Sequence, residues 1–203
     1  MAEAPAAGPR RLVLATRNAH KIEELRSILG PALAGLELVA ATGPEPVEDG
    51  DTFEANALIK ARAASAESGL PAIADDSGIC VDALGGAPGI HSARYAGTRD
   101  DGDNLRLLLS NLGGERGRAA AFVCAAAFVT PDGFEHVELG VWPGEVLDEP
   151  AGEGGFGYDP IFRPEGLSVS AAQLPPAEKH ARSHRARAFG ALMPIVRARL
   201  LAP

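Results

Sequence analysis

The chain has 203 residues, the length of one domain or of one domain with two lobes. Hydrophobic residues make up 46% of it and charged residues 23%, which is globular composition and excludes a disordered chain. The net charge of −8 argues against a dedicated binder of duplex DNA or of anionic membranes, because such proteins need a basic face.

Residues 1–10 are rich in alanine and proline, and we expect a disordered tail there, followed by a single two-lobed domain over residues 11–203. The chain shows no signal-peptide pattern and no run near the roughly 18 apolar residues of a membrane span, which predicts a cytoplasmic protein. Cys80 and Cys124 are too few for a disulfide framework or a cysteine zinc site, so we expect buried, reduced thiols.

The first half of the chain alternates predicted strands and helices. Short apolar runs predict strands at residues 12–15, 36–40 and 72–74. Apolar residues at helical spacing predict a helix over 19–29, which Gly30 and Pro31 end. A pattern that resembles a capping box, Asp51-Thr52-Phe53-Glu54, opens a helix through about Ser68.

The second half has a different pattern. We expect a loop at 84–98, a helix at 103–112, a hairpin of 119–130 with 134–141, a glycine-rich loop at 152–157 and a last helix, capped by Ser183, to about Leu201. This order predicts an α/β fold with a mixed sheet flanked by helices, in two lobes with a cleft between them.

The first predicted strand leads into a turn, Thr16-Arg17-Asn18-Ala19-His20-Lys21, that begins a helix. The free N–H groups of a helix start attract anions, and Thr16, Asn18 and Lys21 add polar and cationic groups. The turn therefore suits a polyphosphate, although the G-x-x-x-x-G-K-[ST] motif is absent. The alternative is an Asn-capped helix with a solvated lysine.

Lysine is rare in this chain. Sixteen of the nineteen basic residues are arginines, and the lysines are Lys21, Lys60 and Lys179. Each is a candidate for a role that needs a compact ammonium group, such as a contact with phosphate. Chance and codon bias are the alternative.

Two acidic segments are candidates for metal chemistry. Adjacent carboxylates in Asp75-Asp76-Ser77-Gly78, directly after an apolar strand, need a compensating cation or proton. Magnesium takes carboxylate ligands, and a carboxylate beside it can accept a proton from water. Glu48-Asp49-Gly50-Asp51 precedes a helix on which Asn56 and Lys60 share a face. Solvated turns are the alternative for both segments.

Two further segments suit a nucleobase. Phe156 lies between glycines in Gly154-Gly155-Phe156-Gly157-Tyr158-Asp159-Pro160 and is placed to stack on a base, unless it is an ordinary core residue. Lys179 and Ser183-His184-Arg185 offer donors that can read a carbonyl oxygen, unless they form only a basic first turn.

Together these blocks resemble one family, the inosine/xanthosine triphosphate pyrophosphatases, also called Ham1-like. The matching stretches are LVLATRNAHKIEEL, EDGDTFEANALIKA, AIADDSG followed by LGGAPGIHSARYAG, GGFGYDPIF and EKHARSHRARA, from Leu12 to Ala188. Each stretch alone is modest, whereas all five in the family's order are highly specific.

The resemblance implies Mg²⁺-assisted attack of water on the α-phosphorus of ITP, dITP or XTP, which yields the monophosphate and pyrophosphate and clears these nucleotides from the pool. It also implies an elongated fold with a nucleotide cleft between the lobes, and a homodimer. The expected partner is a small-molecule nucleotide, with no nucleic acid and no membrane. The alternatives are a pyrophosphatase for another modified nucleotide and a non-catalytic nucleotide-binding protein.

The resemblance also implies roles by position. Asp76 would be the general base and would hold the metal with Glu48. The residues implied to bind substrate are Thr16, Arg17, Asn18, Ala19, His20, Lys21, Lys60, Ser77, Phe156, Gly157, Tyr158, Asp159, Lys179, His184 and Arg185. One position departs from the family: many members carry Glu where this chain has Ala55. Asp49 and Glu54 therefore stay open as alternative metal ligands.

Overall fold

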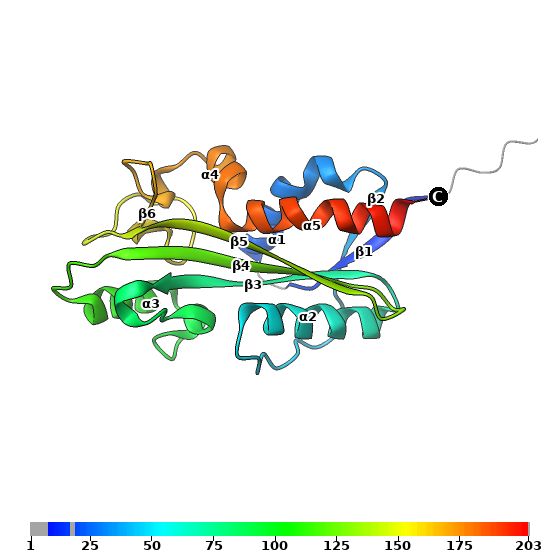
Figure 1. The fold of residues 1–203 in the computed structure, drawn as a ribbon, viewed down its shortest axis with the longest axis horizontal. Coiled ribbons are helices and arrows are strands. Elements are labelled where there is room, and N and C mark those ends of the chain that lie inside the picture. Colours follow the sequence, from blue (N-terminus) through cyan, green and yellow to red (C-terminus); the bar gives the residue numbers. More distant parts are fainter. Residues whose placement is uncertain (1–7, 17–18, 203) are drawn as a thin grey trace, which may run out of the picture.

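A mixed sheet of six strands runs through the molecule in the order β2-β1-β3-β4-β5-β6 (Figure 1). This computed structural model describes residues 8–16 and 19–202. The strands are β1 (Arg10–Leu14), β2 (Leu36–Ala40), β3 (Ala72–Val81), β4 (Ala119–Val129), β5 (Glu135–Val146) and β6 (Phe162–Pro164). Strand β1 runs parallel to β2 and β3, and the other pairs are antiparallel.

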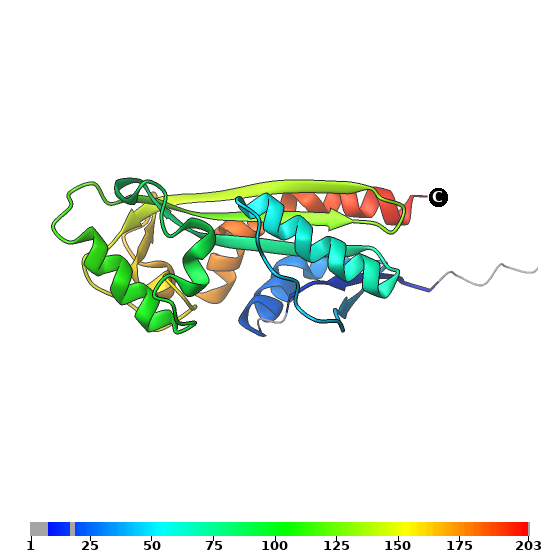
Figure 2. The same cartoon turned by 90° about the horizontal axis from the view of Figure 1, so that it is seen from below.

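Helices cover both faces of this sheet. The α-helices are α1 (Ala19–Leu29), α2 (Phe53–Ser68), α3 (Asp101–Leu112), α4 (Pro176–Arg182) and α5 (His184–Leu201). The 3₁₀ helices are η1 (Gly30–Leu33), η2 (Asp82–Leu84), η3 (Gly89–Arg94), η4 (Asp159–Ile161) and η5 (Ala171–Gln173). Helices α2 and α3 lie on one face and α1, α4 and α5 on the other, in an elongated molecule (Figures 1 and 2). The predicted α/β fold with a mixed, helix-flanked sheet is confirmed.

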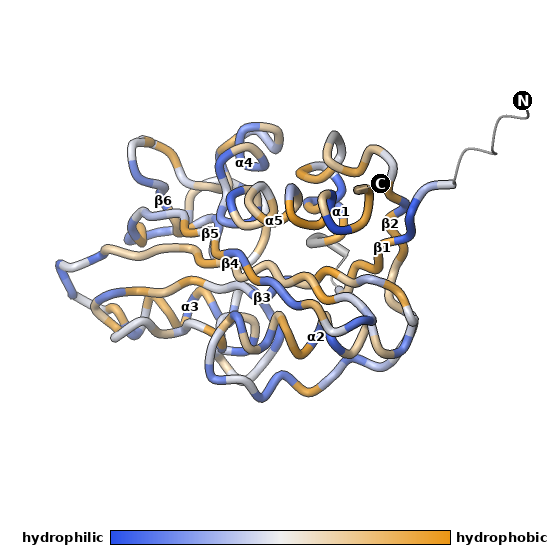
Figure 3. The backbone as a smooth tube through the Cα atoms, turned by 45° about the vertical axis from the view of Figure 1, so that its right-hand side comes forward, coloured by the Kyte–Doolittle hydropathy of each residue, from blue (hydrophilic) through white to orange (hydrophobic). Residues whose placement is uncertain are grey.

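Strand β1 shows why the apolar runs of this sheet do not alternate with polar residues. Leu12 and Leu14 pack with Phe189 and Leu192 of α5, whereas Val13 between them packs on the α2 side. Because helices cover both faces, successive side chains are buried on opposite sides. In Figure 3 the start of β1 is hydrophilic and its remainder is hydrophobic.

The largest difference from the sequence prediction is strand β3. We expected the strand to stop at Ala74 and Asp75–Gly78 to form a turn, but β3 continues to Val81. The prediction was wrong because β4 pairs with β3 along its whole length, from Ala72 to Val81. Strand β1 pairs with β3 only as far as Ile73, and the next bridge outside the β4 pairing joins Cys80 to Pro88. Among the described residues, β3 therefore has an open edge between these two points.

The remaining element predictions differ mainly at their ends. Helix α1 and strand β2 have the predicted bounds, and Ser183 caps α5 by accepting a hydrogen bond from Ala186 N. The cap of α2 is Thr52, whose Oγ1 accepts from Ala55 N at 3.1 Å, and not Asp51. The expected 84–98 loop contains η3. Helix α4 was not predicted because it is only seven residues long and begins with Pro176 directly after Pro175.

Neither cysteine forms a disulfide bond within the described residues. Cys124 is buried as expected, whereas Cys80 is only half-buried. Among the described residues, no helix is long and apolar enough to cross a membrane.

Gly140 tests how closely α5 packs on the sheet. A Cβ at Gly140 on β5 would lie 2.1 Å from His184 O and 2.5 Å from Ala188 N. We therefore expect Gly140→Ala to lower the free energy of unfolding by about 1–3 kcal/mol, because α5 must move outward. Chemical denaturation measures this change.

Gly190 in α5 is the matched control, because a Cβ there meets nothing within 4 Å. Gly190→Ala should raise the free energy of unfolding by up to about 1 kcal/mol, since alanine is the better helix former. An equally stable Gly140→Ala variant would contradict the close packing.

Candidate active site

A cleft of about 200 Å³ lies along the open edge of β3. Its lining combines side chains from both faces of the sheet and from the loops between them. The residues that line it include Thr16, Glu48, Lys60, Asp76, Ser77, Gly78, Ser92, Arg94, Arg99, Asp101, Phe122, Phe156, Gly157, Tyr158, Asp159, Lys179, His184 and Arg185. Segments from residue 16 to residue 185 thus meet in one place.

On the α2 side of the sheet, Asp76 and Glu48 converge on one ammonium group. Lys60 Nζ lies 3.4 Å from Asp76 Oδ1 and 3.3 Å from Glu48 Oε1. Asn56, one turn earlier on α2, donates from Nδ2 to Asp76 Oδ2 at 3.2 Å and accepts from Gly50 N. The helix spacing of Asn56 and Lys60 therefore aims both side chains at one carboxylate.

Lys60 is buried and cationic. Burial favours its neutral form, but the carboxylates of Asp76, Asp75 and Glu48 outweigh this effect and raise the pKa of Lys60. Of the alternative ligands considered from the sequence, Asp49 is exposed, and only Glu48 approaches this ammonium among the described residues.

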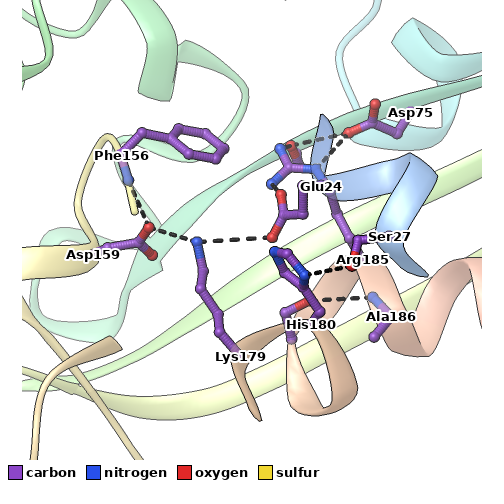
Figure 4. Close-up of polar contacts among 11 residues, drawn as sticks. Glu24, Ser27, Asp75, Phe156, Asp159, Lys179, His180, Arg185 and Ala186 are labelled. Atoms are coloured by element: carbon purple, nitrogen blue, oxygen red, sulfur yellow. Dashed lines mark hydrogen bonds and ion pairs between the residues drawn. The ribbon is translucent and has the colours of Figure 1, made fainter. Parts of the chain in front are cut away.

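On the opposite face, Arg185 holds a buried polar network (Figure 4). Its Nε donates to Asp75 Oδ2 at 3.2 Å, its Nη1 to Glu24 Oε2 at 2.9 Å and its Nη2 to Ser77 Oγ at 2.7 Å. Burial opposes the charge of Arg185, but Asp75 and Glu24 outweigh it and raise its pKa above the ordinary value. Arg185 thus joins α5 to β3 and α1.

Within the described residues, the ion pairs of the two adjacent aspartates are to different cations. Successive residues of a strand point to opposite faces, so Asp75 meets Arg185 while Asp76 meets Lys60. The strand places their charges on opposite sides of β3 and gives each a separate partner.

Lys179 and Asp159 form the end of the cleft near Phe156. Lys179 Nζ donates to Asp159 Oδ2 at 2.6 Å, and the same oxygen accepts from Phe156 N at 2.8 Å. Burial raises the pKa of Asp159 although Lys179 opposes the shift. Gly155 has φ +71°, and a Cβ there would lie 2.1 Å from Asp159 Oδ2, so the tight loop requires glycine.

Cations approach the face of the Phe156 ring. Lys179 Nζ lies 4.9 Å and Arg185 Cζ 5.4 Å from its centroid, within cation–π range. His184 stacks on Phe122 with centroids 4.8 Å apart. This end of the cleft offers a flat apolar ring beside several hydrogen-bond donors, which is the chemistry that a nucleobase with carbonyl groups requires.

Glu24 is a site residue that the sequence analysis did not identify. It is 4% exposed on α1, and its Oε1 lies 3.7 Å from Lys179 Nζ while Oε2 bonds Arg185. One sequence feature could have identified Glu24: it is a carboxylate one turn before Ile28, on the side of the helix that packs against the core. Glu24 links the two cations that flank Phe156.

The structure brings together the predicted site residues whose side chains it describes. Thr16, Glu48, Lys60, Asp76, Ser77 and the residues of the 156–159, 179 and 184–185 segments all line the cleft. Arg17 and Asn18 lie outside the described residues. Ala19, His20 and Lys21 form the first turn of α1. The structure describes the backbone of these three residues but not their side chains.

This chain is similar in sequence and in structure to known proteins. A model of the Ham1 family matches residues 12–195. A dITP/XTP pyrophosphatase of Leifsonia xyli is 58% identical over 93% of this chain and 96% of the relative. One of Streptomyces coelicolor is 53% identical over 92% and 97%. The solved structure of a HAM1 protein from Coxiella burnetii has a TM-score of 0.85 and 38% identity, covering 92% of this chain and 98% of that one.

The buried Glu24 carboxylate gives a stability test. Glu24→Gln leaves Arg185 and Lys179 without their shared countercharge, so we expect unfolding free energy to fall by about 3 kcal/mol. The adjacent Glu23 is exposed, and Glu23→Gln should change stability by less than about 0.5 kcal/mol. Urea denaturation of both variants measures the difference. If the two variants were equally stable, Glu24 would not stabilise the network.

Proposed function

The chain belongs to the Ham1 family, and on this premise we propose that its cleft binds and hydrolyses dITP and XTP. The protein is an enzyme, a pyrophosphatase of non-canonical purine nucleoside triphosphates. The single observation that carries the assignment of the site is that Asp76, Lys60 and Glu48 meet beside the open edge of β3, in one cleft with Phe156.

The triphosphate lies between α1 and α2 in this proposal. Thr16 lines the cleft just before α1, and the N-terminus of that helix supplies free N–H groups. Lys60 approaches from α2. Arg17, Asn18, Ala19, His20 and Lys21 complete the phosphate site as the sequence predicts.

Glu48 and Asp76 would hold a divalent cation, which we take to be Mg²⁺. The two carboxylates already converge on one cationic group, the Lys60 ammonium, so their oxygens face a common space. Two carboxylates with waters and phosphate oxygens form the usual ligand set of Mg²⁺. The bound ion supplies positive charge that stabilises the phosphoryl oxygens.

Asp76 is the proposed general base. Asn56 and Lys60 donate to its two oxygens and hold the carboxylate as a proton acceptor at the cleft. One water proton passes to Asp76 while the water oxygen bonds to the α-phosphorus. The bond from that phosphorus to the bridging oxygen breaks, and the oxygen keeps the electron pair and leaves as part of pyrophosphate.

The purine stacks on Phe156, and nearby donors select its 6-keto group. Arg185 and Lys179 lie over the Phe156 ring, and Arg185 is fixed by its buried partners. Adenine would present an amino donor where hypoxanthine and xanthine present an acceptor, leaving a buried donor unpaired. Such mismatches discriminate strongly between substrates.

Several features stay predictions from the sequence. They are the unity of residues 11–203 as one functional domain, the homodimer, the cytoplasmic location and the lack of a nucleic-acid partner.

Substrate profiling tests the function. We expect rapid pyrophosphate release with Mg²⁺ from dITP and XTP and slow release from dGTP, dATP and dTTP. Adenine lacks the 6-keto acceptor, and thymine is not a purine. Guanine has the 6-keto group, so slow release from dGTP requires that the site has neither room nor an acceptor for its 2-amino group. Release preferentially from a pyrimidine nucleotide would contradict the proposed base site. Binding of dITP without turnover would favour a non-catalytic nucleotide-binding protein.

Asp76→Asn tests the proposed base. The amide cannot accept the water proton, so we expect kcat for dITP to fall about 10²–10⁴-fold with the protein still folded. Asp82→Asn, which alters an exposed aspartate just beyond the same strand, should leave kcat unchanged. Pyrophosphate release measures the activity of both variants, and circular dichroism checks that they are folded. If Asp76→Asn kept nearly full activity, another group would have to accept the water proton.

A further inference from the structure

The buried cations of the described site are already paired with carboxylates. Lys60, Lys179 and Arg185 form ion pairs with Glu24, Glu48, Asp75, Asp76 and Asp159. A nucleoside triphosphate brings several further negative charges, so its binding requires positive charge beyond these three groups.

Arg94 and Arg99 line the same cleft and differ from Arg185. Both side chains are exposed, and neither has a hydrogen bond or ion pair within the described residues. Arg185, in contrast, is buried and donates to three partners. The guanidinium groups of Arg94 and Arg99 are therefore exposed cations at the wall of the cleft, and neither forms an ion pair with a carboxylate of the described residues.

The position of Arg94 is fixed by its attachment to β3. Ser92, two residues earlier in η3, accepts from Ile79 N at 3.0 Å and donates to Gly89 O at 2.6 Å. A Cβ at Gly78 would lie 2.3 Å from Gly89 O, so η3 sits directly against the strand that carries Asp76. Arg94 thus extends from a rigid turn beside the proposed reacting centre.

Arg99 lines the cleft from a segment that other contacts hold in place. Asp101, two residues later, accepts from Gly157 N at 2.7 Å, which ties the start of α3 to the Phe156 loop. Tyr158 Oη donates to Ser92 O at 2.8 Å and ties the same loop to η3. The segment from Ser92 to Asp101 is therefore anchored at both ends around the two arginines.

We infer that Arg94 and Arg99 bind the phosphate groups of the nucleotide and supply the positive charge that the paired cations do not. This inference rests on the proposed function. A guanidinium group presents a planar fork of N–H donors that matches two phosphate oxygens. Bound phosphate would give both arginines the charge partners that they lack in the described structure.

Turnover of dITP by charge-neutral variants tests the inference. We expect Arg94→Gln and Arg99→Gln each to lower kcat/KM about tenfold or more, because each loses a charge-assisted hydrogen bond. Arg116→Gln is the matched control, since Arg116 is also exposed and without a partner in the described residues but lies outside the cleft. It removes the same charge and should change kcat/KM less than twofold.

Binding of inorganic tripolyphosphate separates this inference from the proposed function, because it needs neither a nucleobase nor turnover. In titration calorimetry, we expect Arg94→Gln with Arg99→Gln to weaken tripolyphosphate binding by more than about tenfold. Arg116→Gln should bind like the unaltered protein. An unchanged affinity of the double variant would overturn the inference even if dITP is hydrolysed. A weakened affinity would support it even if the nucleobase assignment is wrong.

Discussion

The site depends on the buried guanidinium group of Arg185. An unpaired charge at this depth would be strongly unfavourable, so Arg185 requires Glu24, Asp75 and Ser77 together. These partners come from α1 and β3, whereas Arg185 belongs to α5. One side chain therefore fixes the first and last helices against the strand that carries Asp76, and its guanidinium carbon lies 5.4 Å from the centroid of the Phe156 ring.

Strand β3 turns one short acidic segment into two different environments. Its pairing with β1 ends at Ile73, which opens one edge to the cleft, while β4 keeps the backbone extended. The alternation of side chains then directs Asp75 into the buried network and Asp76 towards Lys60. Asp75 thus stabilises the fold, and Asp76 is available for the proposed proton transfer. The two carboxylates point to opposite faces of the sheet, which reduces the repulsion between them.

The charge arrangement explains how an acidic protein accommodates a polyanion. The buried lysines and Arg185 are largely neutralised by carboxylates, so they orient groups more than they attract substrate. In the proposed site, attraction is left to the helix start at Ala19, to a metal ion that Glu48 and Asp76 would hold, and to the exposed Arg94 and Arg99. Because the buried cations are paired with carboxylates of the protein itself, the fold is stable without substrate. In the proposed site, the exposed cations are then the ones that bind phosphate.

The sequence by itself determined the α/β class, most strand and helix positions and the residue types of the site, because these follow from local periodicity, capping groups and short motifs. It did not determine that β3 passes through Asp75 and Asp76, since that path depends on β4, about fifty residues later. Arg94 and Arg99 also lacked a local signal, and the signal for Glu24 was only a carboxylate on the core-facing side of its helix. Their relation to the cleft arises only when α1, η3 and α5 meet around β3, and tertiary contacts between distant segments alone decide that.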